Sequence, residues 1–301
     1  MDEALRRFDA LDNPEGVIVC LDADCTVHED YFVSLEKELL NNSKACACSL
    51  YFEHPVGDDP GPASPYRGII LYELHLRYYV GALRAIGYPF AFHTVGSAMA
   101  AKAGEYMRVG GMNRRQAGED FYFIQKLVQS GRYFSINSTS VYPSPRQSHR
   151  VPFGTGATIG KLAEDSEQQF FTYNMDAFRE LEVLFSMKEN LFRSGKRERD
   201  SLYDDLPPGL RYFLDRDDWL MKLEEIRSNT AGYESFSKRF FGWFNMFRTV
   251  RFMNSVHGEV HKRKPVALAA CDLLYHIGHD VIPDDALQLL KHFRQLDRES
   301  H

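Results

Sequence analysis

The stretch that decides the fold is Val17–Cys25, with the sequence Val-Ile-Val-Cys-Leu-Asp-Ala-Asp-Cys. Its apolar residues, Val17 to Leu21, form a continuous run typical of a buried parallel strand. Asp22 and Asp24 follow this run, and ligands of open α/β sheets bind at the carboxyl ends of the strands. Carboxylate oxygens at such an edge suit a hard cation such as Mg²⁺ or Mn²⁺. The alternative is a strand-end turn in which Asp caps the helix that follows.

The composition narrows the class of protein. The chain has 301 residues, 44% of them hydrophobic, enough for one large domain or two smaller ones. A net charge of −6 does not indicate a partner such as a nucleic acid. There is no run of 18 apolar residues and no signal-peptide core, so we expect neither a membrane span nor secretion. Five cysteines without a C-x-x-C spacing fit reduced thiols in a cytoplasmic protein.

The pattern of apolar residues changes near residue 160. Before it, runs typical of strands and helices mix, and after it helical periodicity dominates. We therefore expect an α/β domain over residues 1–160 and an all-helical region over residues 161–301. The expected strands of the first domain are Val17–Leu21, Ala45–Phe52, Pro89–His93, Tyr133–Ile136 and Ser140–Tyr142. Its expected helices are Met1–Leu11, one from Val27 to about Leu40, Tyr66–Ala85, Ala101–Arg108 and Phe121–Gln129.

Two further segments of the sequence form a set of motifs together with Asp22-Ala23-Asp24, through their order and their spacing along the chain. Gly96-Ser97-Ala98-Met99-Ala100 is followed by Val109-Gly110-Gly111-Met112, and then comes Gly118-Glu119-Asp120. With Asp22-Ala23-Asp24, these segments resemble the motifs of family 2 inverting glycosyltransferases, which have the GT-A fold. The resemblance covers roughly Met1–Gly156, with Met112 in place of the usual aromatic residue. It implies a GT-A sheet with helices on both faces that moves a sugar from a nucleotide-diphosphate sugar to a hydroxyl acceptor.

The resemblance also implies roles for individual residues. Asp24 and Asp22 would bind Mn²⁺ or Mg²⁺, which neutralises the donor diphosphate. Asp120 would be the catalytic base and Glu119 a supporting group, and Gly96 and Ser97 would line the acceptor side. Basic residues after the last strand would face the diphosphate: Arg146, His149 and Arg150. Helix capping by the acids and a solvated loop for the basic residues are the structural alternatives.

Members of this family carry βαβ units before the Asp-x-Asp strand, and these hold the nucleobase and ribose. No such units precede Val17, so the resemblance implies a transferase that is truncated at its N-terminus, with an incomplete nucleotide half. The donor sugar and nucleobase therefore cannot be read, and the acceptor is a glycan, a polysaccharide or a lipid-linked molecule. A non-catalytic fragment or scaffold is the alternative.

A second enzyme class also fits part of the sequence. The pattern Asp22-x-Asp24-x-Thr26 after an apolar strand satisfies the first motif of haloacid-dehalogenase-like phosphatases, whose first Asp is a nucleophile. The acids of Asp280–Asp285 resemble their distal motif. No expected strand precedes that segment, and no catalytic lysine is evident, so the transferase is the preferred interpretation.

In the C-terminal region we expect helices over Ser166–Met187, Leu206–Arg216, Trp219–Ser228, Tyr233–Asn254, Val266–Ile277 and Asp284–Gln295, with Lys188–Asp205 as an exposed helix end or linker. Residues 237–254 are apolar over a wide arc, and their charges are all basic. Such a helix is usually buried, and we expect Phe244 and Phe247 inside the monomer. The alternative is peripheral contact with the inner face of the membrane, where basic residues meet anionic lipid.

Overall fold

The computed structural model describes residues 1–57, 66–113, 118–130, 132–145 and 169–300. They form two compact units that interleave along the chain. The first unit comprises residues 1–77, 92–170 and 281–301, and the second comprises residues 78–91 and 171–280. The chain pattern had indicated one boundary near residue 160. The division differs because residues 281–301, which contain the last helix, belong to the first unit with the sheet. Residues 78–91, which contain the end of a long helix, belong to the second unit.

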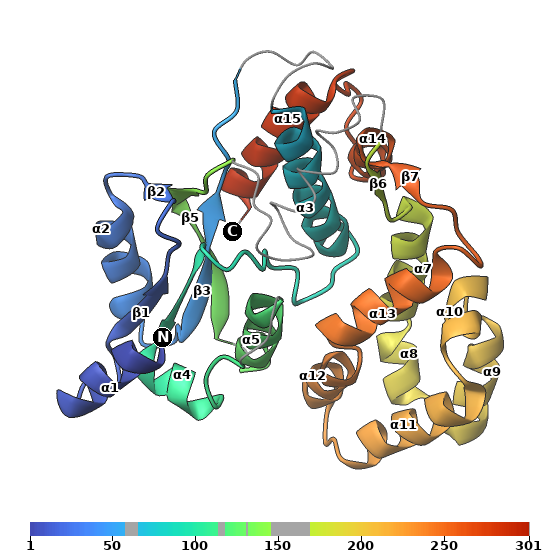
Figure 1. The fold of residues 1–301 in the computed structure, drawn as a ribbon. Helices are drawn as coiled ribbons and strands as arrows, with labels where there is room; N and C mark the ends of the chain where they lie inside the picture. The colour runs from blue at the N-terminus through green and yellow to red at the C-terminus, as the bar shows by residue number, and fades with distance from the viewer. Residues whose placement is uncertain (58–65, 114–117, 131, 146–168, 301) are drawn as a thin grey trace. The chain divides into compact units, whose positions relative to one another are not determined.

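The first unit is a mixed α/β structure (Figure 1). Its strands are β1 (Val17–Cys20), β2 (Thr26–Val27), β3 (Ala47–Phe52), β4 (Met99–Lys102) and β5 (Tyr133–Tyr142). Its helices are α1 (Asp2–Ala10), α2 (Tyr31–Leu35) with a π-helical continuation (Glu36–Leu40), α4 (Ala103–Arg108), α5 (Glu119–Val128), α15 (Ala286–Glu299) and the first part of α3 (Arg67–Ala85). The expected α/β class is thus confirmed for this part of the chain.

The five strands lie in the order β1-β4-β3-β5-β2. Only β3 and β5 are parallel, and the pairs β1–β4, β4–β3 and β5–β2 are antiparallel. The expectation that Val17–Leu21 is a buried parallel strand was therefore wrong. Among the described residues β1 pairs with β4 alone, so it lies at an edge of the sheet and only Ile18 is buried.

Two further strand predictions need correction. Pro89–His93 is not a strand, and the strand at this point of the chain is β4, part of which had been expected to start a helix. Ala100 and Ala101 are buried, and the backbone pairing of β4 with both β1 and β3 outweighs the helix propensity of alanine. Residues 133–142 form the single strand β5 instead of two strands.

The core of the first unit lies under α2. Tyr31, Leu35 and Leu39 pack on alternate residues of β3, including Cys48 and Leu50. These side chains are at most 4% exposed. The alternation follows from the pleat of a strand, which points successive side chains to opposite faces. In Figure 1 α2 and α5 lie on opposite sides of the strands, as expected for helices that cover both faces of a sheet.

A buried network of charges attaches α15 to the sheet unit. Glu73 of α3 accepts hydrogen bonds from Arg77 Nε and Arg294 Nε, both at 2.8 Å, and lies 2.9 Å from Nδ1 of His54. Arg77 also donates to Asp297 of α15 at 2.6 Å. The arginines hold the pKa of Glu73 well below its usual range despite complete burial. Because a buried charge is tolerated only when it is paired, this network specifies where α15 docks.

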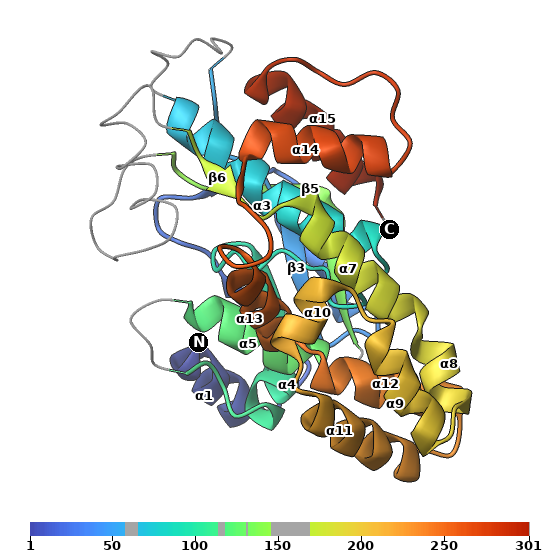
Figure 2. The same cartoon turned by 90° about the vertical axis from the view of Figure 1, so that its right-hand side faces the viewer.

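The second unit is helical apart from a two-stranded ribbon. Its elements are β6 (Phe171–Thr172), α7 (Met175–Ser186), α8 (Lys188–Arg193), α9 (Lys196–Asp204), α10 (Pro208–Phe213), α11 (Arg216–Ser228), α12 (Tyr233–Trp243), α13 (Met246–Val256), β7 (Lys264–Pro265), α14 (Val266–His276) and the end of α3. Figure 2 shows α9, α11 and α12 grouped together at one end of this unit. The expected helical character is confirmed, and the charged segment 188–205 forms α8 and α9.

The aromatic residues of segment 237–254 form the core of this unit. The segment is not one helix, because α12 ends at Trp243 and the Asn245 side chain caps α13 by accepting a hydrogen bond from Arg248 N. Phe244 is fully buried, with its ring 5.8 Å from that of Phe185, whereas Phe247 is only half-buried. Burial of Phe244 is thus confirmed. None of the helices that the structure describes is long and apolar enough to cross a bilayer.

We expect Phe244→Ala to lower the free energy of unfolding by about 3–5 kcal/mol, because it removes a buried ring and leaves a cavity. Tyr275→Ala is the matched control, since Tyr275 lies in the same unit and is 66% exposed. Its effect should stay within about 0.5 kcal/mol. Urea unfolding checks both values, and equal small effects would contradict the packing of this unit.

Candidate functional site

The antiparallel pairing of β1 with β4 brings two sequence motifs to one edge of the sheet. Cys20, the last residue of β1, lies opposite Met99, the first residue of β4. The segment that follows β1 and the segment that precedes β4 therefore meet. The first contains Asp22 and Asp24, and the second contains Gly96 and Ser97.

A tight turn gathers the side chains after β1. The amide of Cys25 donates to the carbonyl of Asp22 at 3.0 Å, which closes the turn. One ligand atom from each of Asp22, Asp24 and Cys25 lies within 4.8 Å of the others. Both aspartates are exposed, so their carboxylates are accessible from solvent. The turn therefore forms a cluster of two carboxylates and one thiol.

The segment before β4 supports this cluster and also reaches α5. Ser97 lies close enough to Cys25 to lower the pKa of its thiol, and the backbone of Gly96 packs against the Asp120 carboxylate. A Cβ at position 96 would lie 3.3 Å from Oδ2 of Asp120, so glycine permits this close approach. The structure thus places the segment with Gly96 and Ser97 next to Asp120 and beside the turn that contains Asp22 and Asp24.

Glu119 and Asp120 begin α5. Gly118 precedes them in the left-handed conformation, with φ of 74°, and sets the direction in which the helix starts. Asp120 accepts a hydrogen bond from Phe121 N at 2.7 Å. Oε2 of Glu119 is buried and has no hydrogen-bond partner among the described residues. A buried carboxylate oxygen without a partner is costly, so this atom has an unsatisfied capacity to accept a hydrogen bond.

The site is strongly anionic. Partial burial raises the pKa of the Asp22 carboxyl, and the charges of Asp24 and Glu119 raise it further. Burial likewise raises the pKa of Asp120, and Glu119 adds to this shift, while the N–H groups of Phe121 and Gly96 oppose it. The negative charge at this edge therefore favours a bound cation.

The donor set fits Mg²⁺ or Mn²⁺. Two carboxylates from one turn leave most of an octahedral shell to water and substrate oxygens, which is how these cations usually bind beside phosphates. Cys25 is less suited as a ligand for a hard cation, because burial raises the pKa of its thiol. Asp22 and Asp24 are thus the residues that would hold the metal, with Cys25 beside them.

The described part of the chain does not include the other predicted site residues. Arg146, His149 and Arg150 lie outside the described residues, as does most of the loop Glu53–Pro65. In the acidic segment that resembles a phosphatase motif, Asp285 caps α15 by accepting a hydrogen bond from Gln288 N at 2.9 Å. That contact gives this aspartate a structural function.

Sequence reasoning missed two residues of the site region. Cys25 had been quoted as part of the motif without a role, although its position next to Asp24 is a sufficient signal. His93, which begins the segment that leads to Gly96, had been placed in a strand. Its contacts are with Ser49, Phe52 and Asp297. No local sequence pattern could have indicated the contact with Asp297, because this residue is about two hundred positions away along the chain.

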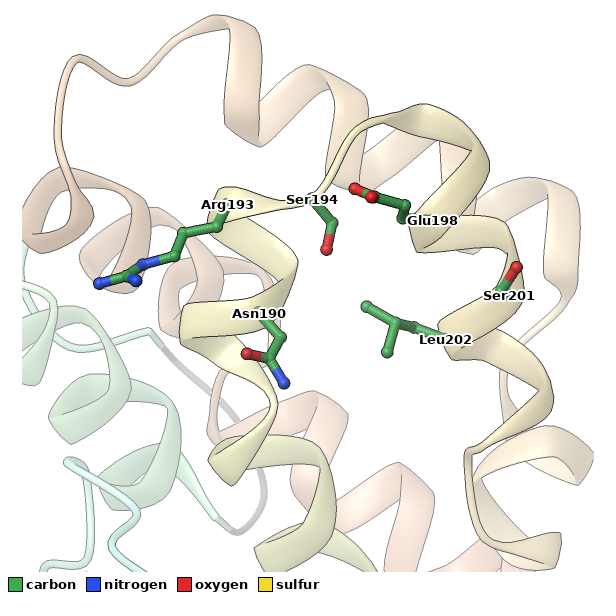
Figure 3. A pocket seen from close by; sticks show the side chains of 6 residues that line it. All are labelled: Asn190, Arg193, Ser194, Glu198, Ser201 and Leu202. Atoms are coloured by element: carbon green, nitrogen blue, oxygen red, sulfur yellow. The ribbon is translucent and has the colours of Figure 1, made fainter.

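The second unit contains an open surface pocket of about 530 Å³ between α8 and α9 (Figure 3). It is lined by Asn190, Arg193, Ser194, Glu198, Ser201 and Leu202. Glu198 accepts a hydrogen bond from Gly195 N at 2.8 Å, and Arg193 pairs with Glu189 on the surface. These polar groups already have partners in the local helix structure, and none belongs to the sequence motifs.

No family model, curated protein or solved structure matches this chain.

Replacement of Asp22 by Asn tests the electrostatics of the cluster. Because its pKa is raised on folding, ionised Asp22 lowers stability as the pH rises through and above its unfolded value of 3.8. In EDTA at pH 7 we expect Asp22→Asn to be at least as stable as the wild type, with any gain vanishing below about pH 4. The same variant should bind Mn²⁺ more weakly by about tenfold or more.

Calorimetric titration with Mn²⁺ and thermal unfolding in EDTA provide these two measurements. Asp9→Asn is a control, since this aspartate is an exposed residue of α1 outside the cluster. A wild type that binds no Mn²⁺, or an Asp22→Asn variant that binds it as well as the wild type, would rule out this metal site.

Proposed function

We propose that this protein is a metal-dependent inverting glycosyltransferase of the GT-A type, which uses a nucleotide-diphosphate sugar and a hydroxyl acceptor. One observation carries the proposal, namely that Asp22 and Asp24 meet Gly96, Ser97 and Asp120 at a single sheet edge. These residues come from three separate segments of the chain. Only the pairing of β1 with β4 and the start of α5 unite them.

Each group has a function in such a reaction. Mn²⁺ or Mg²⁺, when bound by Asp22 and Asp24, supplies positive charge to the leaving diphosphate. Asp120 accepts the proton of the acceptor hydroxyl, and its raised pKa makes it a stronger base than a solvated aspartate. The N–H group of Phe121 and the packing against Gly96 fix the orientation of its carboxylate. Glu119 accepts a hydrogen bond from an acceptor hydroxyl through its unpartnered oxygen.

The arrangement supports an acceptor with several hydroxyls, such as a glycan or a polysaccharide. Glu119 and Asp120 are neighbours on α5, and together they offer carboxylate oxygens to two hydroxyl groups. The proposal also includes a lipid-linked molecule as an alternative acceptor. It places the protein in the cytoplasm, near the inner face of the membrane. Buried Phe244 gives no support to the membrane-surface alternative for residues 237–254.

Asp120→Asn tests the proposed base. We expect transfer to fall by about 10²–10⁴-fold, because the amide cannot accept the acceptor proton, while Mn²⁺-dependent donor binding stays within about twofold. The assay supplies the full chain with Mn²⁺, a panel of nucleotide-diphosphate sugars and hydroxyl acceptors, and it follows release of the nucleoside diphosphate. Donor binding is measured by calorimetry.

Asp217→Asn is the matched control, since Asp217 is the second residue of α11 just as Asp120 is the second residue of α5. This control should leave transfer unchanged. Donor binding without any transfer in the wild type would favour a non-catalytic scaffold. Hydrolysis of a phosphomonoester that disappears in Asp22→Asn would favour the phosphatase and contradict the proposal.

A further inference from the structure

The segment from His93 to Ala98 connects the buried charge network of the sheet unit with the candidate site. His93 Nε2 donates to Oδ2 of Asp297 at 2.9 Å, and this carboxylate also accepts from Arg77 Nη1 at 2.6 Å. At the other end of the segment, the amide of Leu50 donates to the carbonyl of Ala98 at 2.8 Å. Gly96 and Ser97 lie between these two attachments.

The attachment at His93 is constrained from several directions. Its carbonyl accepts a hydrogen bond from Ser49 Oγ at 3.0 Å, and its ring meets Phe52 edge to face at 5.2 Å. The His93 side chain is 11% exposed and that of Asp297 is 7% exposed, so their hydrogen bond is shielded from water. Hydrogen bonds to a charged group are stronger in such surroundings.

We infer that Asp297 of the C-terminal helix α15 is a positioning residue for the Asp120 carboxylate, and that it acts through His93 and the backbone of residues 93–97. Gly96 packs against the Asp120 carboxylate, since a Cβ on this glycine would lie 3.3 Å from Oδ2, and it lies three residues from His93. A displacement of His93 therefore moves the backbone against which the Asp120 carboxylate is packed. The catalytic part of this inference rests on the proposed transferase, but the structural part does not.

This inference also gives α15 a function beyond docking. The helix is separated from Asp120 by more than 160 residues of chain, yet one hydrogen bond, a short segment and the packing of Gly96 against Asp120 join them. A different side chain of the sheet provides separate bonds to the end of the chain. Asn137 Nδ2 donates to the carbonyls of Asp297 and Ser300, at 2.8 and 2.6 Å. Docking and positioning can therefore be tested separately.

The first measurement is amide hydrogen exchange in the full chain, read by mass spectrometry over peptides that contain residues 93–98. His93→Phe keeps an aromatic ring against Phe52 but removes the hydrogen bond to Asp297. Asp297→Asn removes the charge on the other side of the same bond. We expect both variants to speed exchange of this segment about tenfold or more, with exchange of β3 unchanged.

Asn137→Ala is the matched control. It removes two bonds between the sheet and α15, so exchange near the end of α15 should rise while residues 93–98 stay protected. His93→Phe leaves the pair of Arg77 and Asp297 intact, so it tests the inference even if Asp297→Asn fails to fold. Combined in one chain, His93→Phe and Asp297→Asn should change exchange of this segment by less than the sum of their separate effects, because both substitutions act on the bond between His93 and Asp297.

The second measurement is steady-state transfer. We expect His93→Phe to lower kcat about tenfold or more while KM for the donor stays within about twofold, because the base is displaced and the metal ligands are not. Unchanged exchange in both variants would overturn the inference, and so would faster exchange with an unchanged kcat. If the wild type shows no transfer, the proposed function fails, and the exchange data alone decide whether Asp297 positions this segment.

Discussion

The antiparallel pairing of β1 with β4 is the constraint on which the candidate site depends. It fixes Cys20 opposite Met99, so the residues after one strand and before the other lie at the same edge. A shift of this register by one residue would turn every side chain of β1 to the opposite face. Asp22 and Ser97 would then no longer be held beside each other. The chemistry proposed for this edge therefore follows from the sheet topology.

Small residues make that pairing and the site compatible. Alanine side chains in β4 allow it to pack between β1 and β3 without strain. Glycine at position 96 lets the backbone approach the Asp120 carboxylate closely. The sheet unit contains two clusters of charged side chains, one around Glu73 and one around Asp22, and they differ in the charges of the neighbouring groups. Glu73 is neutralised by arginines, whereas Asp22 lies beside further negative charge, which is the condition that a cation relieves.

The sequence predicts the parts of this structure whose signals are local. The helix α3 and the strand β3 follow from long, regular apolar patterns, and both lie where they were expected. The strand β4 was not predicted, because Met-Ala-Ala-Lys reads as helical until its neighbours are known. The orientation of β1 was wrong for a related reason, since an apolar run does not reveal which strands it pairs with.

The site shows the same difference between features with a local sequence signal and features that depend on distant segments. The motifs containing Asp22, Asp24, Gly96, Ser97 and Asp120 could be found from residue types and spacing. Their meeting at one edge, and the contact of Gly96 with Asp120, depend on pairings between distant segments. The network of His54, Glu73 and Arg294 joins residues up to 240 positions apart, so no local pattern could show it. It decides where α15 lies, and through Asp297 it reaches His93.

Paramagnetic broadening by Mn²⁺ tests the central claim most directly. Manganese is added at substoichiometric amounts to the ¹⁵N-labelled full chain, and the loss of amide signal is mapped along the sequence. Our account predicts that residues 22–25, 95–97 and 118–120 broaden together, because the three segments surround one cation. It also predicts that Asp24→Asn abolishes this broadening. Broadening confined to the first segment, or centred on acids elsewhere such as residues 280–285, would contradict it.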